Sequence, residues 1–181
     1  MKLYFSNIWL LEQFYSLVTS LEYNVRILKA EKNHIPGIAL IYKKCFPRES
    51  MHREWIASTY ASFPRASYFI VEIEGEVVAY ILWCFKNGFR EQSILELEQI
   101  GVAPEFRGKG IAKDLIKKSF ELISAEVSRL NLNIKSIIVT TREGNHAEAI
   151  YKSALGVERV ALIKGYGSGD EVILLKSIET S

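Results

Sequence analysis

The feature of this sequence that most constrains its fold is a strand that ends in a glycine-bearing basic turn and leads into an amphipathic helix. The strand covers residues 94–102, and the turn covers residues 103–110. The helix is predicted because apolar residues recur at three- and four-residue steps along one stripe. These residues are Ala112, Ile116, Phe120, Ile123, Val127 and Leu130. Charged residues such as Lys113, Lys117 and Glu121 flank the stripe as a solvated face.

Strand and helix patterns alternate on both sides of this unit. The β-branched and aromatic runs at residues 67–74 and 77–85 predict a hairpin that turns at Glu74-Gly75-Glu76. Further strands are predicted near Val25 and Ile27 and at residues 134–140, 157–163 and 171–175, and further helices at residues 33–45, 55–63 and 145–155. This order predicts an α/β fold of the α+β type, with a mixed sheet and helices on its faces.

The composition is that of a single globular domain. The chain has 181 residues, of which 49% are hydrophobic and 24% are charged, so disorder and low-complexity structure are excluded. Lys and Arg number 23 against 21 for Asp and Glu. A formal net charge of +2 gives no reason to expect a nucleic acid partner or an anionic membrane. Any anion recognition must therefore be local.

Residues 1–22 are interpreted as an N-terminal helical extension, and residues 23–177 as the main domain. The extension has apolar residues mostly at helical spacing, namely Phe5, Ile8, Trp9, Leu11, Phe14, Tyr15, Val18 and Leu21. No stretch reaches the roughly 20 apolar residues that span a bilayer, so no membrane partner is expected. The large apolar residues of the extension suggest that it packs on the domain or on a second subunit of a homodimer.

Cys45 and Cys84 are too few to build a disulfide-stapled secreted scaffold. Neither cysteine has a second cysteine or a histidine at metal-ligand spacing. We expect both to be free thiols in a cytoplasmic protein, and we expect no metal site.

The basic turn is a candidate anion site. A helix N-terminus presents unpaired backbone N–H groups and a partial positive charge, which favour phosphate. Gly108 and Gly110 allow close approach of a ligand to the backbone, and Arg107 and Lys109 add positive charge. The spacing fits neither a Walker loop nor a dinucleotide-binding fingerprint. On these grounds alone, a pyrophosphate cradle and a plain basic turn are equally compatible with the sequence.

At these residues the sequence resembles the GNAT superfamily of acyl-CoA-dependent N-acyltransferases. Arg107, Gly110 and Ala112 match the signature Gln/Arg-x-x-Gly-x-Gly/Ala, and residues 102–106 match its usual Val-x-Pro-Glu-aromatic lead. The resemblance covers residues 23–176. It implies a mostly antiparallel sheet of six or seven strands with helices on both faces, and acetyl-CoA as cosubstrate.

The resemblance also implies which residues bind acetyl-CoA. The backbone amides of the turn would hold the pyrophosphate, the end of the preceding strand would pair with the pantetheine amides, and Asn145 would contact the pantetheine arm. The residues concerned are Ile100, Gly101, Val102, Arg107, Gly108, Lys109, Gly110, Ile111, Ala112 and Asn145.

Two acids on the strand are candidates for the general base. Glu96 and Glu98 lie two residues apart and, in a regular strand, share one face with Ile100 and Val102. By the resemblance, Glu96 stands where several family members carry a base, and Glu98 is the alternative.

A tyrosine of the following helix is the candidate acid. In the register set by Asn145 and Gly156, the family's tyrosine position is occupied by Lys152, and Tyr151 comes one residue early. One residue is about 100° around a helix. Tyr151 therefore reaches the sulfur of the coenzyme only if the turn is adjusted, and the alternative is a tyrosine of the core or of an interface.

The acceptor is expected to be a primary amine. The sequence looks most like the branch of ribosomal-protein alanine N-acetyltransferases, which modify peptide N-termini, but Thr140 replaces the glutamate that this branch carries. A small amine such as an aminoglycoside, a polyamine or an amino acid stays open. A non-catalytic CoA-binding module is the alternative from another class.

Overall fold

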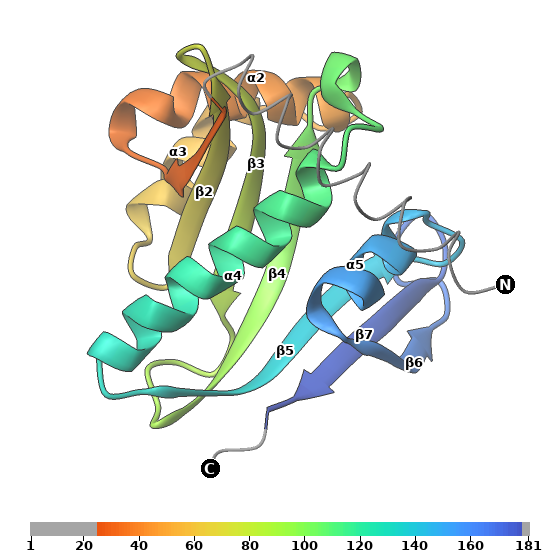
Figure 1. Ribbon diagram of the computed structural model, residues 1–181. Coiled ribbons are helices and arrows are strands. Elements are labelled where there is room, and N and C mark those ends of the chain that lie inside the picture. The colour runs from red at the N-terminus through yellow and green to blue at the C-terminus, as the bar shows by residue number, and fades with distance from the viewer. Residues whose placement is uncertain (1–24, 179–181) are drawn as a thin grey trace, which may run out of the picture.

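The computed structural model describes residues 25–178, which form a sheet of seven strands in the order β1-β2-β3-β4-β5-β7-β6 (Figure 1). All neighbouring strands are antiparallel except β4 and β5, which are parallel. The strands are β1 (Val25–Lys29), β2 (Ala66–Ile73), β3 (Glu76–Phe85), β4 (Gln92–Val102), β5 (Asn133–Arg142), β6 (Glu158–Ile163) and β7 (Glu171–Ser177). The mixed, mostly antiparallel sheet confirms the predicted fold class.

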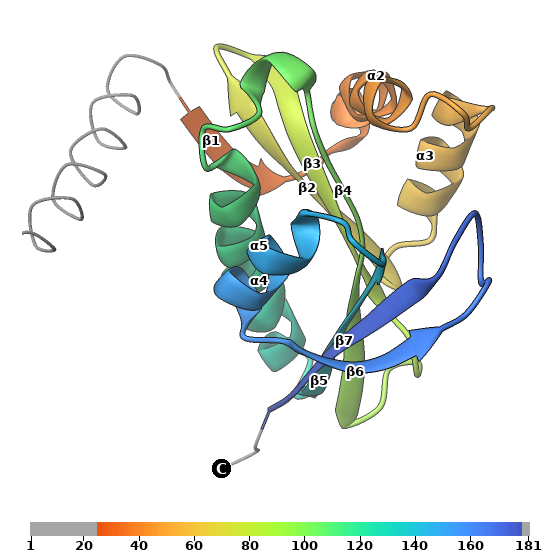
Figure 2. The ribbon, with the colours of Figure 1, turned by 90° about the vertical axis from the view of Figure 1, so that its right-hand side faces the viewer.

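Helices lie on both faces of the sheet, as predicted. Figure 2 shows α4 and α5 on one side of the sheet and α2 and α3 on the other. The helices are α2 (Ile35–Cys45), α3 (His52–Ala61), α4 (Ile111–Arg129) and α5 (Ala147–Leu155), with short 3-10 turns η1 (Lys32–His34) and η2 (Pro104–Phe106). Pro36 lies in the first turn of α2, where its missing N–H leaves no helical hydrogen bond unmade.

The larger hydrophobic core lies between the sheet and the helices α4 and α5. The predicted stripe of α4 contributes Ile116, Ile123 and Val127, all at most 2% exposed. The indole Nε1 of Trp83 in β3 donates a hydrogen bond of 2.9 Å to the buried hydroxyl of Ser119 in α4. This bond satisfies two polar groups that are removed from water, and it fixes α4 on the sheet.

A second core lies between the other face of the sheet and the helices α2 and α3. It contains Ile38 and Ile41 from α2 and Ile56 from α3, packed against residues of β2 and β3 such as Tyr80 and Leu82. Strands β2, β3 and β4 are thus covered on both faces, which explains why β2 and β3 read as nearly continuous apolar runs.

Strands β5, β7 and β6 are covered on one face only, within residues 25–178. On the α5 side, Val139, Val172 and Leu174 are fully buried. On the opposite side, Thr140 is exposed and Ile173 is only partly buried. We call this second side the open face. It lies on the same side of the sheet as α2 and α3 (Figure 2).

The predicted N-terminal helix at residues 1–22 lies outside the described residues. The proposed boundary between this extension and the domain, and the homodimer suggested by its apolar residues, both depend on that segment. These expectations stay predictions.

Candidate active site

Strands β4 and β5 pair over only part of their lengths. Their parallel ladder ends at Leu97 and Val139, whereas β4 continues along β3 to Val102 and β5 continues along β7 to Arg142. Beyond the last pair, the two strands diverge toward the top of Figure 1. Residues 98–102 therefore have no strand partner on their β5 side among the described residues. Apart from the carbonyl of Val102, which accepts the Arg107 Nε at 3.0 Å, their backbone groups on that side are available to an extended ligand.

A β-bulge at Glu98 accompanies this divergence. Trp83 of β3 pairs with Leu97, and its neighbour Leu82 pairs with Gln99, so Glu98 is an extra residue of β4. A bulge resets the alternation of side chains and bends the strand that carries it. The bend lies where β4 and β5 separate.

The bulge corrects one prediction about β4. Ile100 and Val102 pack against the core on the α4 side, whereas Glu96 pairs with Cys84 of β3, which belongs to the core on the α2 side. The expectation that Glu96 and Glu98 share a face with Ile100 and Val102 is therefore wrong, because it assumed a regular strand.

The turn that follows β4 exposes backbone donors. Gly108 and Gly110 have φ angles of 75° and 80°, in the region that favours glycine, and Gly110 is the N-cap of α4. The N–H groups of residues 108–110 donate to no described backbone acceptor, and those of the first helical turn have no partner by helix geometry. These donors and the positive end of α4 fit a pyrophosphate.

The two basic residues of the turn lie beside this cradle. The Arg107 Nε donates to the carbonyl of Val102 at 3.0 Å, and its second guanidinium nitrogen lies 3.5 Å from the sulfur of Cys45. The Lys109 ammonium lies 5.2 Å from the centre of the Phe106 ring. Arg107 is thereby tethered to the end of β4, where its charge adds to that of the helix terminus.

Glu96 is held in a small polar cluster where β4 borders the open face. The carboxylate side chain is 8% exposed, and Lys86 Nζ lies 2.6 Å from its Oε2. The hydroxyl of Thr140 in β5 donates to the other oxygen, Oε1, at 3.5 Å. The hydrogen bond that Lys86 donates to Glu96 raises the pKa of Lys86 above its ordinary value, against the opposing effect of burial. Glu96 is therefore a carboxylate with a cation already beside it.

Glu98 differs from Glu96 because its side chain is exposed. Burial raises the pKa of the Cys84 thiol, and the hydrogen bond and negative charge of Glu98 raise it further. The Glu98 carboxylate therefore lies next to Cys84, on the same side of the sheet as Glu96. The structure thus brings the two predicted acids together on one side, with different access to solvent.

Tyr151 lies on the buried side of α5. It is 7% exposed and packs in the α4-side core together with Leu155, one turn further along the helix. Burial raises the pKa of its phenol to about 12, so the group keeps its proton at neutral pH. Lys152, the next residue around the helix, pairs with Glu148 at 2.9 Å. The role of Tyr151 as the acid stays a prediction.

Asn145 lies just before α5, and both ends of its amide are engaged. Its Nδ2 donates to the Thr141 hydroxyl at 3.0 Å, and its Oδ1 accepts the Ala147 N–H at 3.0 Å. The N-cap position belongs to His146, so the predicted cap is one residue off, although Asn145 still satisfies a donor of the first turn. Its contact with the pantetheine arm stays a prediction.

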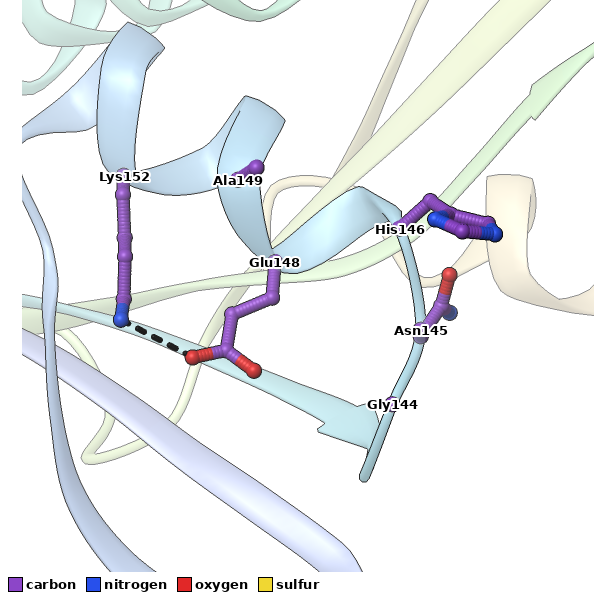
Figure 3. A pocket seen from close by; sticks show the side chains of 6 residues that line it. All are labelled: Gly144, Asn145, His146, Glu148, Ala149 and Lys152. Carbon is purple, nitrogen blue, oxygen red and sulfur yellow. Dashed lines mark ion pairs between the residues drawn. The ribbon is translucent and has the colours of Figure 1, made fainter.

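A shallow hollow of about 340 Å³ opens beside Asn145. Figure 3 shows the Glu148 and Lys152 side chains pointing toward each other along one side of α5. The lining residues are Gly144, Asn145, His146, Glu148, Ala149 and Lys152. The hollow is therefore lined by the start of α5 and not by the buried side that carries Tyr151.

Two cations near the acids, Lys86 and Arg142, were not predicted from the sequence. Lys86 follows β3 directly, and its partner Glu96 is ten residues further along the chain. Arg142 ends β5 on the same face as Thr140, and alternation along that strand was the signal that could have placed it there. Cys45 and Cys84 are free thiols, as predicted.

No helix within residues 25–178 combines the length and apolar character needed to cross a bilayer. In the same part of the chain, no three acidic, histidine or cysteine side chains gather in a way suited to a metal ion.

Residues 35–157 match the family described as "Acetyltransferase (GNAT) family". The match begins at the first residue of α2 and ends just after α5. It therefore includes the bulge, the basic turn and α4.

Two curated proteins are similar in sequence. N-acetylaspartate synthetase of Xenopus tropicalis is 29% identical over 127 residues, which are 70% of this chain and 43% of that protein. L-2,4-diaminobutyric acid acetyltransferase of Vibrio parahaemolyticus serotype O3:K6 is 31% identical over 104 residues, which are 52% of this chain and 51% of that protein. The chain thus spans about half the length of the curated relatives it matches.

Among solved structures, the ribosomal-protein-S18-alanine N-acetyltransferase from Escherichia coli is similar with a TM-score of 0.67 at 19% identity. The similarity covers 87% of this chain and 96% of that protein. At this level of identity, the likeness shows the fold.

Proposed function

The chain belongs to the GNAT acetyltransferase family, and we propose that it transfers the acetyl group of acetyl-CoA directly to a primary amine. In this proposal the cosubstrate lies along the unpaired side of β4, and its pyrophosphate lies on the turn before α4. The acceptor approaches from the open face.

The observation that carries the proposal is the continuity of two binding elements. The β5-side edge of residues 98–102 offers hydrogen-bonding groups to an extended amide chain, and the unpaired donors at residues 108–112 follow it immediately. Pantetheine is such a chain, and it ends in a pyrophosphate. Ile100, Gly101 and Val102 would pair with the pantetheine, while the residues of the turn and first helical turn would bind the phosphates.

We assign the base role first to Glu98 and second to Glu96. Glu98 is exposed at the bulge, where the ladder of β4 and β5 ends. Glu96 is nearly buried, and its charge is compensated by Lys86 at 2.6 Å. A base that receives a proton from an incoming amine needs access to that amine. Glu98 meets this requirement better, and the Glu96–Lys86 pair would position the groups around it.

The chemical step follows from these positions. The neutral amine nitrogen attacks the thioester carbon, the new C–N bond forms, and the C–S bond breaks. A backbone N–H at residues 100–102 would stabilise the oxyanion, Glu98 would take the amine proton, and Tyr151 would protonate the departing sulfur. At pH 7, freeing the amine costs about 4.6 kcal/mol for a lysine side chain and about 1.4 kcal/mol for an α-amine. A weak carboxylate base is therefore better matched to an α-amine.

Two classes of acceptor are consistent with an α-amine. One is a peptide or protein N-terminus, which is the acceptor implied by the resemblance to the alanine N-acetyltransferase branch. The other is a small amino compound. The names of both curated relatives contain an amino acid, either as the acetylated product or as the acceptor, and this observation favours the second class.

The proposal is tested with the full chain, acetyl-CoA and panels of amines, measuring both free coenzyme A thiol and acetylated product. We expect thiol release that depends on the amine and that is matched by product. Acetyl-CoA at 100 times its dissociation constant should also add about 2.7 kcal/mol of stability, or several degrees in melting temperature at about 2–4 °C per kcal/mol. The proposal is overturned if acetyl-CoA causes no melting shift and no amine causes release of coenzyme A thiol.

A further inference from the structure

The open face carries polar side chains in an ordered row along β5. Side chains alternate along a strand, and Ile137, Val139 and Thr141 face the α4-side core. Thr140 and Arg142 therefore face the opposite side, which is the side of Glu96. The hydrogen bond between Thr140 and Glu96 confirms this placement.

The Arg142 guanidinium is available to a ligand. Arg142 is exposed, and it forms no ion pair with any carboxylate of residues 25–178. One of its terminal nitrogens donates to the carbonyl of Ser168 at 3.2 Å, in the turn between β6 and β7. A guanidinium has five donors in a fixed fork. The contact with the turn therefore orients the group and leaves most of its donors free.

The register of β4 and β5 sets the spacing between Arg142 and the two acids along the strand direction. Glu96 is level with Ile138 in the parallel ladder, and Glu98 lies two residues further on. Arg142 is four residues beyond Ile138, so at about 3.3 Å per residue its backbone lies roughly 13 Å along the strand direction from the level of Glu96 and roughly 7 Å from the level of Glu98. A compound with an amine and a carboxylate a few ångströms apart can span this gap when the side chains converge on it.

We propose that Arg142 binds a carboxylate of the acceptor, and that the acceptor is therefore a free amino acid. The amine is held by the acids of β4 and the carboxylate by the guanidinium at the end of β5. Between them, the partly buried Ile138 and Ile173 provide an apolar floor. This inference rests on the proposed acetyl transfer, and it names the class of acceptor.

Charge complementarity distinguishes this acceptor from the others. A peptide N-terminus has an amide where the amino acid has its carboxylate, and aminoglycosides and polyamines have no carboxylate at all. Of these acceptors, only an amino acid can pair its amine with the acids of β4 and its carboxylate with Arg142. A guanidinium also matches a carboxylate in bidentate geometry, which a lysine cannot reproduce.

The test compares acceptors that differ only in the carboxylate. The full chain is assayed with α-, β- and γ-amino acids, with the C-terminal amide of each, and with the matching decarboxylated amine. We expect kcat/KM to be at least about 10-fold higher for the acids, since hydrogen bonds to a charged group contribute a factor of this order or more. Peptides that lack a carboxylate near the amine should resemble the amides.

The variant Arg142→Ala, with Arg142→Lys as the conservative change, then assigns the effect. We expect Arg142→Ala to lower kcat/KM by about 10- to 100-fold for the preferred amino acid, mainly through KM, and to leave the amide unaffected. Arg142→Lys should recover part of the loss. Arg129→Ala is the matched control, because Arg129 is an exposed arginine at the far end of α4 without an ion pair in the described residues. Melting temperatures show whether each variant is folded.

The outcomes separate the inference from the function on which it rests. Equal activity on acids and amides, a preference for peptides, or an equal loss on both acceptor types in Arg142→Ala would overturn the inference and leave acetyl transfer intact. A failure to acetylate any amine would instead overturn the proposed function. A selective loss confined to carboxylate-bearing acceptors supports the inference.

Discussion

Gly108→Ala and Gly88→Ala form a matched pair that separates backbone strain from recognition of coenzyme A. The two glycines have φ angles of 75° and 76°, and an added Cβ would meet no atom within 4 Å at either position. Gly108 belongs to the turn before α4, whereas Gly88 lies in the connection between β3 and β4. Alanine at positive φ costs about 1 kcal/mol. Both variants should therefore melt about 2–4 °C lower than the parent chain.

Only Gly108→Ala should weaken the binding of coenzyme A. The added methyl group would enter the open space in front of the backbone donors that follow β4. Losing one hydrogen bond from a backbone N–H to a charged phosphate costs about 1.5–3 kcal/mol. This corresponds to a roughly 10- to 150-fold higher Kd. Gly88→Ala should keep the Kd of the parent chain.

Isothermal titration of the full chain with coenzyme A measures both Kd values directly. Titration at two salt concentrations adds a second readout, because the contribution of the phosphates falls as salt screens their charges. If Gly108→Ala binds coenzyme A as tightly as Gly88→Ala does, the pyrophosphate does not lie on this turn. If both variants lose binding equally, loss of stability is the cause and the assignment fails as well.

Three further predictions concern the two acids, Lys86 and Tyr151. Glu98→Gln should lower turnover about 10²- to 10⁴-fold at neutral pH, and its turnover should recover as pH rises, because the amine is then deprotonated in bulk solvent. Glu96→Gln should cause a smaller loss of turnover at neutral pH. If the two variants have identical rate profiles from pH 6 to 10, the assignment of Glu98 as the base is contradicted. Since the pKa of Lys86 is raised in the folded state above its ordinary 10.5, its pair with Glu96 stabilises the fold below about pH 10.5 and loses this contribution as pH rises further. Lys86→Met should accordingly melt about 1–4 °C below the parent at pH 8, for a partly exposed pair contributing about 0.5–1 kcal/mol. The difference should shrink as the pH rises above the ordinary pKa of 10.5. Tyr151→Phe should reduce turnover without changing the Kd of acetyl-CoA. Unchanged turnover would refute the role of Tyr151 as the acid and leave it with a structural role in the core.

Most of the fold was predictable because its signals are local. The hairpin turn at Glu74-Gly75 has φ angles of 51° and 86°, as expected where Gly follows a residue at positive φ. The apolar stripe of α4 recurs at the period of a helix and packs in the core beside the sheet as predicted, except at Leu130, which follows the last helical residue and is exposed. The basic turn could be recognised in the sequence because the unpaired N–H groups of a glycine-rich turn before a helix depend on the local backbone and not on the rest of the chain.

The arrangement of the acids was not predictable from the same sequence. The bulge at Glu98 depends on the register between β3 and β4, which is set by the packing of Trp83 and Leu97 on α4 and not by any local pattern. The contact of Thr140 with Glu96 depends on the parallel pairing of β4 and β5, which are separated along the chain by α4. Alternation could have placed Arg142, but only after that pairing was known.

The partial ladder between β4 and β5 makes ligand occupancy measurable without any chemistry. Amide protons of residues 98–102 that point away from β3 have no acceptor in the neighbouring strand, so they should exchange with solvent faster than those on the β3 side. A bound extended ligand would give these amides acceptors and slow their exchange. Alternate residues of a single strand would thus report on the bound and free states, while their neighbours serve as an internal reference.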